Sequence, residues 1–455
     1  MSEYLEYIAG KARIAPPCGF NPVDMSGELM SFQRDIVTWS SRRGRAAIFA
    51  DCGMGKTVMQ LEWARQVCAH TGGRVLILAP LAVATQTVEE GQKFGIEARY
   101  LRADDDGDGI IVTNYEMLDH FDADSFAGVV LDESSILKSQ DGKTRTRVIE
   151  AFAQTPYRLA CTATPAPNDH IELGNHAAFL GIMTPQEMLS TYFVHDGGST
   201  QNWRLKGHAR RDFWSWVCSW AVMVRKPSDL GYDDGAFHLP PLSIHSITVD
   251  SDRSDGFLFA MTAETLQERL AARRSSVEER VAACAELVNA SDEPWIVWCG
   301  LNAESSMLAN MIPDAIEVRG SDSAAQKEAA LADFSHGKTR VIVTKPSIAG
   351  FGMNWQHCAR VAFVGLSDSW ESYYQAVRRC WRFGQERPVE VYIITASSEG
   401  AVVANIKEKE KAAREMIDGM LAEMRDITLA TIKGSGRSFV SYSPERDMEV
   451  PQWVA

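Results

Sequence analysis

The segment Ala50-Asp51-Cys52-Gly53-Met54-Gly55-Lys56-Thr57 decides the fold of this chain. It follows the apolar run AAIFA at 46–50 and precedes a stretch with helical spacing, the context that a phosphate-binding loop requires. Its glycines let the backbone curl so that N–H groups and a helix N-terminus point at phosphates, although Ala50 stands where the pattern usually begins with glycine. The segment from Cys52 to Thr57 is therefore predicted to bind a nucleotide, with Lys56 on its β- and γ-phosphates and Thr57 on Mg²⁺.

Two adjacent carboxylates follow another apolar run, about 75 residues after this loop. In the stretch VVLDESS at 129–135, Asp132 and Glu133 come at the end of a predicted buried strand. In P-loop ATPases a carboxylate at such a strand end holds Mg²⁺, and a neighbouring group orients or deprotonates the attacking water. The sequence thus predicts an ATP site in which Asp132 binds the metal and Glu133 acts on water.

Short apolar runs alternate with helical stretches in both halves of the chain. Continuous apolar strands of this kind are typical of parallel sheets covered by helices, so we expect two α/β lobes. The runs lie at 46–50, 75–79, 110–112, 129–131 and 157–161, and then at 295–298, 315–318, 340–343, 360–364 and 389–394. The predicted segments are a first lobe at 1–181, a helical insertion and linker at 182–290, a second lobe at 291–400, and a C-terminal helix with a weakly ordered tail at 401–455.

Two of these segments have further features. In the insertion, Trp214, Trp216 and Trp220 are expected to pack in a buried helix and not to form a platform for nucleic-acid bases. In the C-terminal helix, the apolar stripe is expected to dock on one of the lobes. That stripe consists of Ile406, Ile417, Leu421 and Met424.

The composition limits the classes of protein to which this chain can belong. The 455 residues carry a formal net charge of -14 and are 45% hydrophobic, the balance of a soluble globular protein. This charge argues against a uniformly basic nucleic-acid binder but allows a positive track along one face. No apolar run of about 18 residues and no secretory signal pattern occurs, so we expect a cytoplasmic protein without a membrane partner. The nine cysteines are scattered, without a C-x-x-C pair, and are expected to be reduced thiols.

Several further segments resemble the motifs of helicase superfamily two, over about residues 30 to 395. Phe32-Gln33 is similar to the motif that reads adenine, CTATP at 161–165 to motif III, TKPSIAGFGMNWQ at 344–356 to motif V, and QAVRRCWRFGQ at 375–385 to motif VI. The resemblance implies two RecA-like lobes that close on ATP. It also implies nucleotide contacts by Gln33, Gly352 and Gln375, and coupling of nucleotide state to lobe movement by Thr162 and Thr164.

Motif VI supplies two arginines whose role also follows from chemistry. Phosphoryl transfer gathers negative charge on the γ-phosphate oxygens, and an arginine from a second lobe stabilises that charge only when the lobes close. Arg379 and Arg382 are three residues apart, so on a helix they share one face. Both are predicted to be catalytic.

Three details resemble the Swi/Snf-type branch of this superfamily. They are the segment 224–249 with its Leu-Pro-Pro, the extension PAPNDHIEL after motif III, and the Gly-Gln that ends motif VI. This branch implies translocation on duplex DNA without strand separation, and the short chain resembles compact versions encoded by bacteriophages and prophages. A monomeric motor is compatible with it. Ser135 stands where the family usually has histidine, so the contact between motifs II and III is expected to differ.

The expected DNA contacts come from the motifs and from positive clusters. Asn114 lies in VTNYEML, which resembles a DNA-contacting motif, and Lys138 follows motif II directly. Arg204 and Lys206 belong to a further cluster that could meet phosphates. Two alternatives remain open, namely an RNA or single-strand helicase and an ATP-gated DNA clamp with weak catalysis. The complete set of catalytic residues argues against the clamp.

Overall fold

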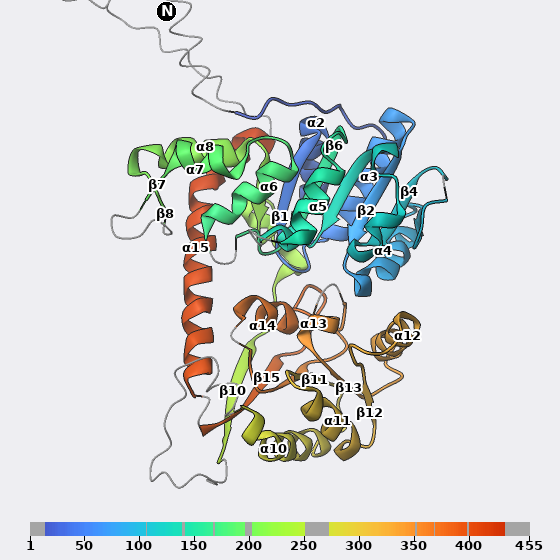
Figure 1. Ribbon diagram of the computed structural model, residues 1–455, viewed down its shortest axis with the longest axis vertical. Coiled ribbons are helices and arrows are strands. Elements are labelled where there is room, and N and C mark those ends of the chain that lie inside the picture. The colour runs from blue at the N-terminus through green and yellow to red at the C-terminus, as the bar shows by residue number, and fades with distance from the viewer. Residues whose placement is uncertain are drawn as a thin grey trace, which may run out of the picture.

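The chain forms two α/β lobes, one stacked on the other, with a long helix running beside both (Figure 1). The computed structural model describes residues 14–105, 107–138, 142–166, 169–195, 203–250, 273–350, 353–367, 369–397 and 400–432. Each lobe is built on one parallel sheet covered by helices, which confirms the predicted fold of two RecA-like lobes. Within the described residues, no helix has both the length and the apolar character needed to cross a membrane.

The first lobe contains a seven-stranded sheet in the order β3-β4-β2-β5-β6-β1-β9. All of its neighbouring strands pair in parallel. The strands are β1 (Arg45–Ala50), β2 (Arg74–Ala79), β3 (Ala98–Tyr100), β4 (Ile110–Asn114), β5 (Phe126–Asp132), β6 (Tyr157–Thr162) and β9 (Ala221–Val224). The helices are α2 (Ser31–Arg43), α3 (Lys56–Thr71), α4 (Leu81–Lys93), α5 (Lys143–Ala151), α6 (Leu173–Phe179), α7 (Pro185–Tyr192) and α8 (Arg210–Cys218). A small antiparallel hairpin joins β7 (Phe193–His195) to β8 (Trp203–Leu205).

Both faces of this sheet are buried, which explains why its strands are apolar throughout. In β1, Ala47 and Phe49 pack into the core cluster beside α6 and α8. Ile48 and Ala50 point to the opposite face and pack into the cluster that includes α2 and α3. Successive side chains of a strand alternate between faces, so a strand covered on both sides needs an apolar residue at every position.

The second lobe contains a six-stranded sheet in the order β10-β15-β14-β11-β13-β12. Its strands also pair in parallel throughout. They are β10 (Leu242–Val249), β11 (Trp295–Cys299), β12 (Ala315–Glu317), β13 (Val341–Thr344), β14 (Arg360–Val364) and β15 (Val389–Ala396). The helices are α10 (Val277–Asn289), α11 (Asn302–Met311), α12 (Ala324–Ser335), α13 (Pro346–Ala349) and α14 (Trp370–Val377).

The central segment 182–290 contributes a strand to each sheet. β9 pairs with β1, the strand that leads into the phosphate-binding loop, and β10 pairs with β15, which follows motif VI. Trp214, Trp216 and Trp220 are all buried, in agreement with the packing role predicted for them. The numerical limits of the four predicted segments stay a prediction, and the tail after residue 432 lies outside the described residues.

The helix α15 (Gly400–Ile432) contacts both lobes. Ile406 joins the core cluster of the second lobe, whereas Met420 and Met424 join a cluster of the first lobe. Ile417 and Leu421 pack against that same first-lobe cluster. The predicted apolar stripe therefore docks as expected, but it serves two lobes and not one (Figure 1).

Candidate active site

The phosphate-binding loop joins β1 to α3 and lies close to the second lobe. Gly53 and Gly55 have φ angles of 87° and 77°, in the left-handed region that favours glycine. A Cβ atom at Gly53 would lie 2.8 Å from the backbone nitrogen of Phe383, which belongs to motif VI. Lys56 donates hydrogen bonds from Nζ to the carbonyl oxygens of Ala50 at 2.9 Å and Asp51 at 3.3 Å. The loop thus approaches motif VI so closely that a side chain at Gly53 would clash.

Gln33 lies beside this loop, in the first turn of α2. Its Nε2 donates to the carbonyl oxygen of Met54 at 3.1 Å, and its Oε1 accepts from the backbone nitrogen of Met30 at 3.0 Å. A Cβ atom at Gly55 would lie 2.3 Å from the same Nε2. The residue that resembles the adenine-reading glutamine is therefore in direct contact with the phosphate-binding loop.

The two predicted carboxylates lie at the carboxyl end of β5 and are buried. Asp132 accepts a hydrogen bond from Gln60 Nε2 at 2.7 Å, and its backbone oxygen accepts one from the Tyr115 hydroxyl at 2.7 Å. Glu133 has a φ angle of 53°, although it is not a glycine. Such backbone strain is uncommon and tends to occur at functional sites. It sets the direction in which the Glu133 side chain leaves the sheet.

Electrostatics mark this pair as a site for positive charge. Burial raises the pKa of both Asp132 and Glu133, while the nearby Lys56 ammonium lowers the pKa of each. The carboxylate of Asp132 and the hydroxyl of Thr57 are oxygen donors of the kind that Mg²⁺ takes, together with substrate phosphates and waters. The residues present therefore fit a magnesium site. Bound there, Mg²⁺ would neutralise phosphate charge.

Three arginines follow the end of α14, and two of them, Arg378 and Arg379, contact the loop. Helix α14 ends at Val377, so Arg379 and Arg382 lie in the turns after it and not on one helix face, which their spacing had predicted. The most direct contact is that of Arg378, which forms an ion pair with Asp51 at 2.8 Å and donates to the Cys52 carbonyl oxygen at 2.9 Å. The Tyr374 hydroxyl also donates to Asp51, at 2.6 Å. These contacts tie motif VI to the first lobe. They involve an arginine that the sequence reasoning had not selected.

The two predicted catalytic arginines lie beside Arg378. Arg379 donates to the carbonyl oxygen of Gln375 at 2.8 Å, and Arg382 donates to that of Met353 at 3.2 Å. Within the described part of the chain, neither has a carboxylate as ion-pair partner. Burial, and then the charge of Arg379, lower the pKa of Arg382 to about 10. Guanidinium groups that have no carboxylate ion-pair partner of this kind are suited to a polyanion such as a triphosphate.

Gln375 and Gln385 have different surroundings. Gln375 is 1% exposed, and its Nε2 has no hydrogen-bond partner among the described residues. Gln385 is buried and donates from Nε2 to the carbonyl oxygens of Gln356, Cys358 and Cys380. The glutamine of the Gly-Gln that ends motif VI thus connects this motif to the end of motif V by a hydrogen bond. Gly352, the remaining predicted nucleotide contact, lies outside the described residues.

Motif III contacts both the predicted catalytic carboxylate, Glu133, and the second lobe. Thr162 donates from Oγ1 to Glu133 Oε2 at 3.4 Å, and the backbone nitrogen of Thr164 donates to Thr162 Oγ1 at 3.1 Å. The Thr164 hydroxyl donates to Glu371 Oε1 at 3.0 Å, and Glu371 lies on α14. The predicted coupling residues therefore connect the two lobes physically.

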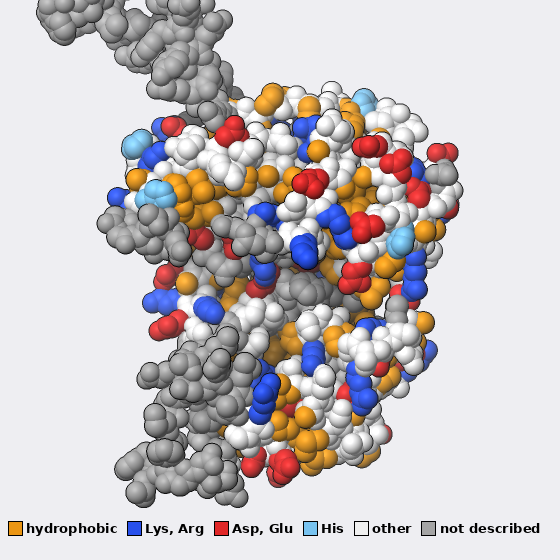
Figure 2. All heavy atoms as spheres, viewed as in Figure 1, with side chains coloured by type: hydrophobic (Ala, Val, Ile, Leu, Met, Phe, Trp, Pro, Cys, Tyr) orange, Lys and Arg blue, Asp and Glu red, His pale blue; other side chains and the backbone are white. Residues whose placement is uncertain are grey.

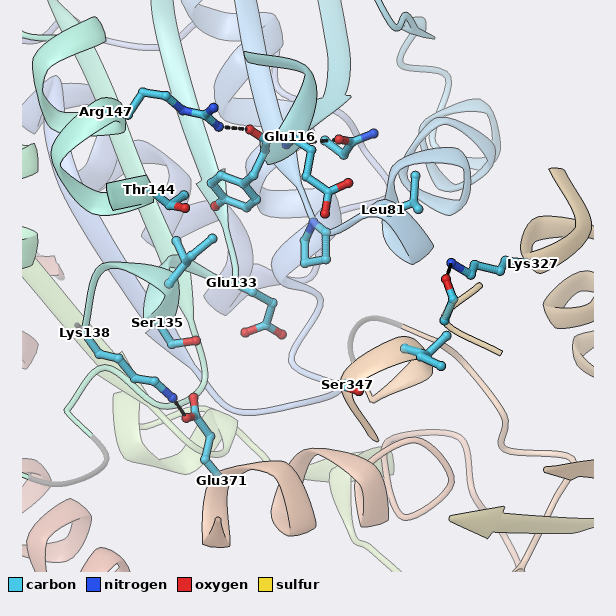
Figure 3. Close-up of a pocket in the computed structure, with 16 residues that line it drawn as sticks. Leu81, Glu116, Glu133, Ser135, Lys138, Thr144, Arg147, Lys327, Ser347 and Glu371 are labelled. Atoms are coloured by element: carbon cyan, nitrogen blue, oxygen red, sulfur yellow. Dashed lines mark hydrogen bonds and ion pairs between the residues drawn. The ribbon is translucent and has the colours of Figure 1, made fainter. Parts of the chain in front are cut away.

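A cavity of about 570 Å³ opens between the lobes next to Glu133. Glu133 lines this cavity (Figure 3) and also interacts with the Lys56 ammonium of the phosphate-binding loop, which lowers its pKa. Lys138 extends across the junction to Glu371, with which it forms an ion pair. On the face shown in Figure 2, Lys and Arg side chains lie on both sides of the junction, with acidic side chains among them. The lining includes Pro80, Leu81, Asn114, Tyr115, Glu116, Ser135, Ile136, Thr144, Arg147, Gly320, Lys327, Ser347 and Ile348.

The structure brings together only half of the predicted DNA contacts. Asn114 and Lys138 both line the cavity. Arg204 lies in the β7–β8 hairpin, outside the lining. Lys206 donates to the carbonyl oxygens of Ser190 and Thr191, at the end of α7. A role for Arg204 and Lys206 on nucleic acid stays a prediction.

Four residues of the site were missed by the sequence reasoning, namely Asp51, Glu90, Glu371 and Arg378. Arg378 and Asp51 had a signal, because an extra arginine in motif VI and a carboxylate in the loop are complementary charges. Glu90, on α4, carries a pKa that burial raises and that the Arg382 charge lowers, so it faces the second lobe. Glu371 had no signal, since an acidic residue in the first turn of a helix is common.

Two family models match parts of the chain. The model described as "Type III restriction enzyme, res subunit" matches residues 27–167, and the model described as "Helicase conserved C-terminal domain" matches residues 279–384. The first covers the phosphate-binding loop and motifs II and III, and the second covers motifs V and VI. Together they indicate a helicase-type ATPase of superfamily two, and they imply ATP hydrolysis and binding of nucleic acid. A search of curated proteins gives no match.

Proposed function

We propose that this chain is a Mg²⁺-dependent, nucleic-acid-stimulated ATPase of the Swi/Snf type that moves along duplex DNA. The observation that carries the proposal is the position of Glu133, which belongs at once to the ATP site and to the cavity between the lobes. An occupant of the cavity can thereby influence the residue that acts on water. We further propose that this chain is one of the phage- or prophage-encoded members of this branch that its motifs resemble.

Each residue of the ATP site has a role in this proposal. Lys56 and the loop backbone bind the phosphates, Gln33 and Gln375 contact the nucleotide, and Thr57 with Asp132 holds Mg²⁺. Glu133 orients and deprotonates the attacking water. Arg379 and Arg382 stabilise charge on the γ-phosphate oxygens once the lobes have closed.

The cavity provides the contact with the track. The lining offers an ammonium at Lys138, an amide at Asn114 and hydroxyls at Thr144 and Ser347, all of which are groups that bind phosphate oxygens. Residues from both lobes line it, so closure and opening change the distance between phosphate contacts on the two sides. Repeated cycles would move the lobes along one strand of a duplex.

The first experiment compares tracks. ATPase rates are measured with linear duplex DNA, single-stranded DNA and RNA of equal length, at two salt concentrations. Stimulation that is greatest with duplex DNA, and that weakens as salt rises, is expected because phosphate contacts release counterions. An ATPase rate that no nucleic acid raises would refute the proposal.

The second experiment tests movement. A translocase on duplex DNA displaces a third strand bound to that duplex at a rate tied to ATP hydrolysis, but leaves the two duplex strands paired. Glu133→Gln, which binds ATP without turnover, is the matched control and should displace nothing. ATP-dependent unwinding of a tailed duplex would instead favour the helicase alternative, and tight ATP-dependent DNA binding without displacement would favour the clamp.

A further inference from the structure

A chain of hydrogen bonds leads from the ATP site to the cavity. It runs from Glu133 through Thr162 and Thr164 to Glu371, with successive distances of 3.4, 3.1 and 3.0 Å. The other carboxylate oxygen of Glu371 accepts from Lys138 Nζ. Glu371 comes from the second lobe, and the other four residues come from the first. This glutamate is thus the point at which the chain crosses between the lobes (Figure 3).

The two ends of the Glu371 contact differ in their access to solvent. The Glu371 side chain is 9% exposed, whereas that of Lys138 is 40% exposed. A phosphate in the cavity can therefore reach the ammonium of Lys138. It would meet the Glu371 carboxylate there as well, so repulsion by this carboxylate opposes attraction by the lysine.

Lys138 is distinct among the basic residues that line the cavity. Arg147 donates to the Tyr115 carbonyl oxygen and pairs with Asp119, both in the first lobe. Lys327 donates to the Gly320 carbonyl oxygen at 2.7 Å, within the second lobe. Of these three lining cations, Lys138 is the one whose described partner lies in the opposite lobe. Binding of a polyanion to Lys138 therefore acts on the junction itself.

The replacement of the usual motif II histidine fits this arrangement. Ser135 lines the cavity, while the neighbouring Ser134 hydroxyl is 3.1 Å from His176 Nε2 within the first lobe. The hydroxyl of Thr164 in motif III has its partner in Glu371 of the second lobe. Motif III is thus connected to the second lobe through Glu371.

We propose that Glu371 is a positioning residue that makes ATP hydrolysis depend on nucleic acid in the cavity. The inference rests on the proposed function and specifies how its stimulation arises. A phosphate that binds Lys138 breaks the ion pair between Lys138 and Glu371. Glu371 then moves together with α14. Thr164 and Thr162 follow, and Glu133 reaches the orientation in which it acts on water. Because linkage is reciprocal, Glu371 also weakens nucleic-acid binding in the resting state.

The test is Glu371→Gln, assayed as ATPase rate against the concentration of linear duplex DNA. The maximal stimulation should fall by about fivefold or more, the size of a typical coupling between sites. The concentration for half-maximal stimulation should also fall, because a negative charge has left the cavity and Lys138 is free. A merely structural role would not produce weaker stimulation together with tighter binding.

A second variant distinguishes the Thr164–Glu371 hydrogen bond from the Lys138–Glu371 ion pair. Thr164→Val keeps the Lys138–Glu371 pair but removes the hydrogen bond to Glu371, so stimulation should fall while the half-saturating DNA concentration stays within about twofold of the wild type. Lys338→Ala, which removes a surface pair with Asp333 elsewhere in the second lobe, is the control and should match the wild type. If Glu371→Gln does not fold, Thr164→Val decides.

The outcomes that overturn the inference are distinct from failure of the proposed function. Stimulation within about twofold of the wild type in Glu371→Gln, or in Thr164→Val if the first variant does not fold, overturns the inference alone. A wild-type rate that no nucleic acid raises overturns the proposed function and this inference with it. Weaker stimulation with tighter binding in Glu371→Gln, and weaker stimulation alone in Thr164→Val, support it.

Discussion

The two sides of the junction between the lobes are held by different kinds of ion pair. On the nucleotide side, Arg378 and Asp51 have side chains that are 4% and 18% exposed, and Tyr374 adds a hydrogen bond. On the cavity side, Lys138 is 40% exposed where it meets Glu371. A buried pair is costly to break, whereas a partly exposed one is screened by salt and yields to a competing anion. The contact between the lobes is therefore stable at the nucleotide side and more easily broken at the cavity side.

The charge balance of the two sides differs as well. The nucleotide side brings Arg378, Arg379 and Arg382 together around a loop whose Asp51 pairs with the first of them. At the junction on the cavity side, the carboxylate of Glu371 is paired with the ammonium of Lys138. The first arrangement places the guanidinium groups of Arg379 and Arg382 beside the predicted site of the ATP phosphates. The second arrangement is nearly neutral, so whether the pair stays intact depends on the charge of the molecule that enters the cavity.

The largest expected effect comes from removing one of these two guanidinium groups on the nucleotide side. Arg379→Ala or Arg382→Ala should each lower kcat by about 10³-fold or more, as for an arginine that stabilises charge in phosphoryl transfer. Lys338→Ala, which removes an exposed cation, is the control. Single-turnover hydrolysis of ATP measures the effect. A loss of less than about tenfold in both arginine variants would contradict the assignment.

Glu133, which lies at both the nucleotide side and the cavity side, should give the next largest effect on kcat. Glu133→Gln should lower kcat by about 10² to 10⁴-fold, the usual contribution of a general base, and should still bind ATP. Lys56→Ala should abolish turnover too, but with loss of ATP binding, since the lysine contacts the phosphates themselves. Equilibrium binding of ATP alongside turnover distinguishes the two variants. A Glu133→Gln protein with wild-type turnover would remove Glu133 from the mechanism.

The ion pair between Arg378 and Asp51 at the nucleotide side can be removed directly by mutation. Arg378→Leu leaves the largely buried Asp51 without its ionic partner and with the Tyr374 hydrogen bond, so the free energy of unfolding should fall by about 1 to 3 kcal/mol and the KM for ATP should rise. The double variant with Asp51→Asn should lose less than the sum of the single losses, because the pair acts as a unit. Thermal unfolding and ATP kinetics on the four proteins measure this. Additive losses would show that the pair does not hold the lobes.

The smallest expected effect is on pH dependence. Because burial raises the pKa of Glu133 and Asp132, kcat/KM for ATP should fall with acidification at a pH above the ordinary carboxyl value of about 4.3. Groups with raised pKa bind protons more tightly in the folded state, so their protonation does not destabilise the fold. Unfolding monitored at the same pH values separates the two effects. A rate that stays constant down to pH 4.3 would contradict the raised pKa.

Much of the fold followed from the sequence because the strands are apolar throughout. Each of the ten predicted runs coincides with or overlaps a strand of the two sheets. The edge strands were harder to recognise. β3 has three residues and no apolar run, and β10 has only half-buried and exposed positions at the edge of its sheet. β9 was obscured by the surrounding tryptophans, although its four residues are all buried.

The site was predictable where chemistry fixes the residue type. The loop from Cys52 to Thr57 and the carboxylates of Asp132 and Glu133 lie where the motifs placed them, at the carboxyl ends of β1 and β5. Contacts between the lobes could not be predicted in the same way. Glu371 meets Lys138 and Thr164 only through the arrangement of two separate sheets, and no local pattern in the sequence records that arrangement.

The position of α15 at the far end of the chain has a consequence for synthesis. Met420 and Met424 cover part of the first-lobe core beside α8, and Glu423 pairs with Arg210 on that helix. The ribosome completes β9 long before it reaches α15. At ordinary elongation rates this face of the nascent first lobe stays uncovered for roughly 10 to 35 s. During that interval the lobe presents apolar surface to chaperones and to neighbouring nascent chains, until the last helix of the described residues covers it.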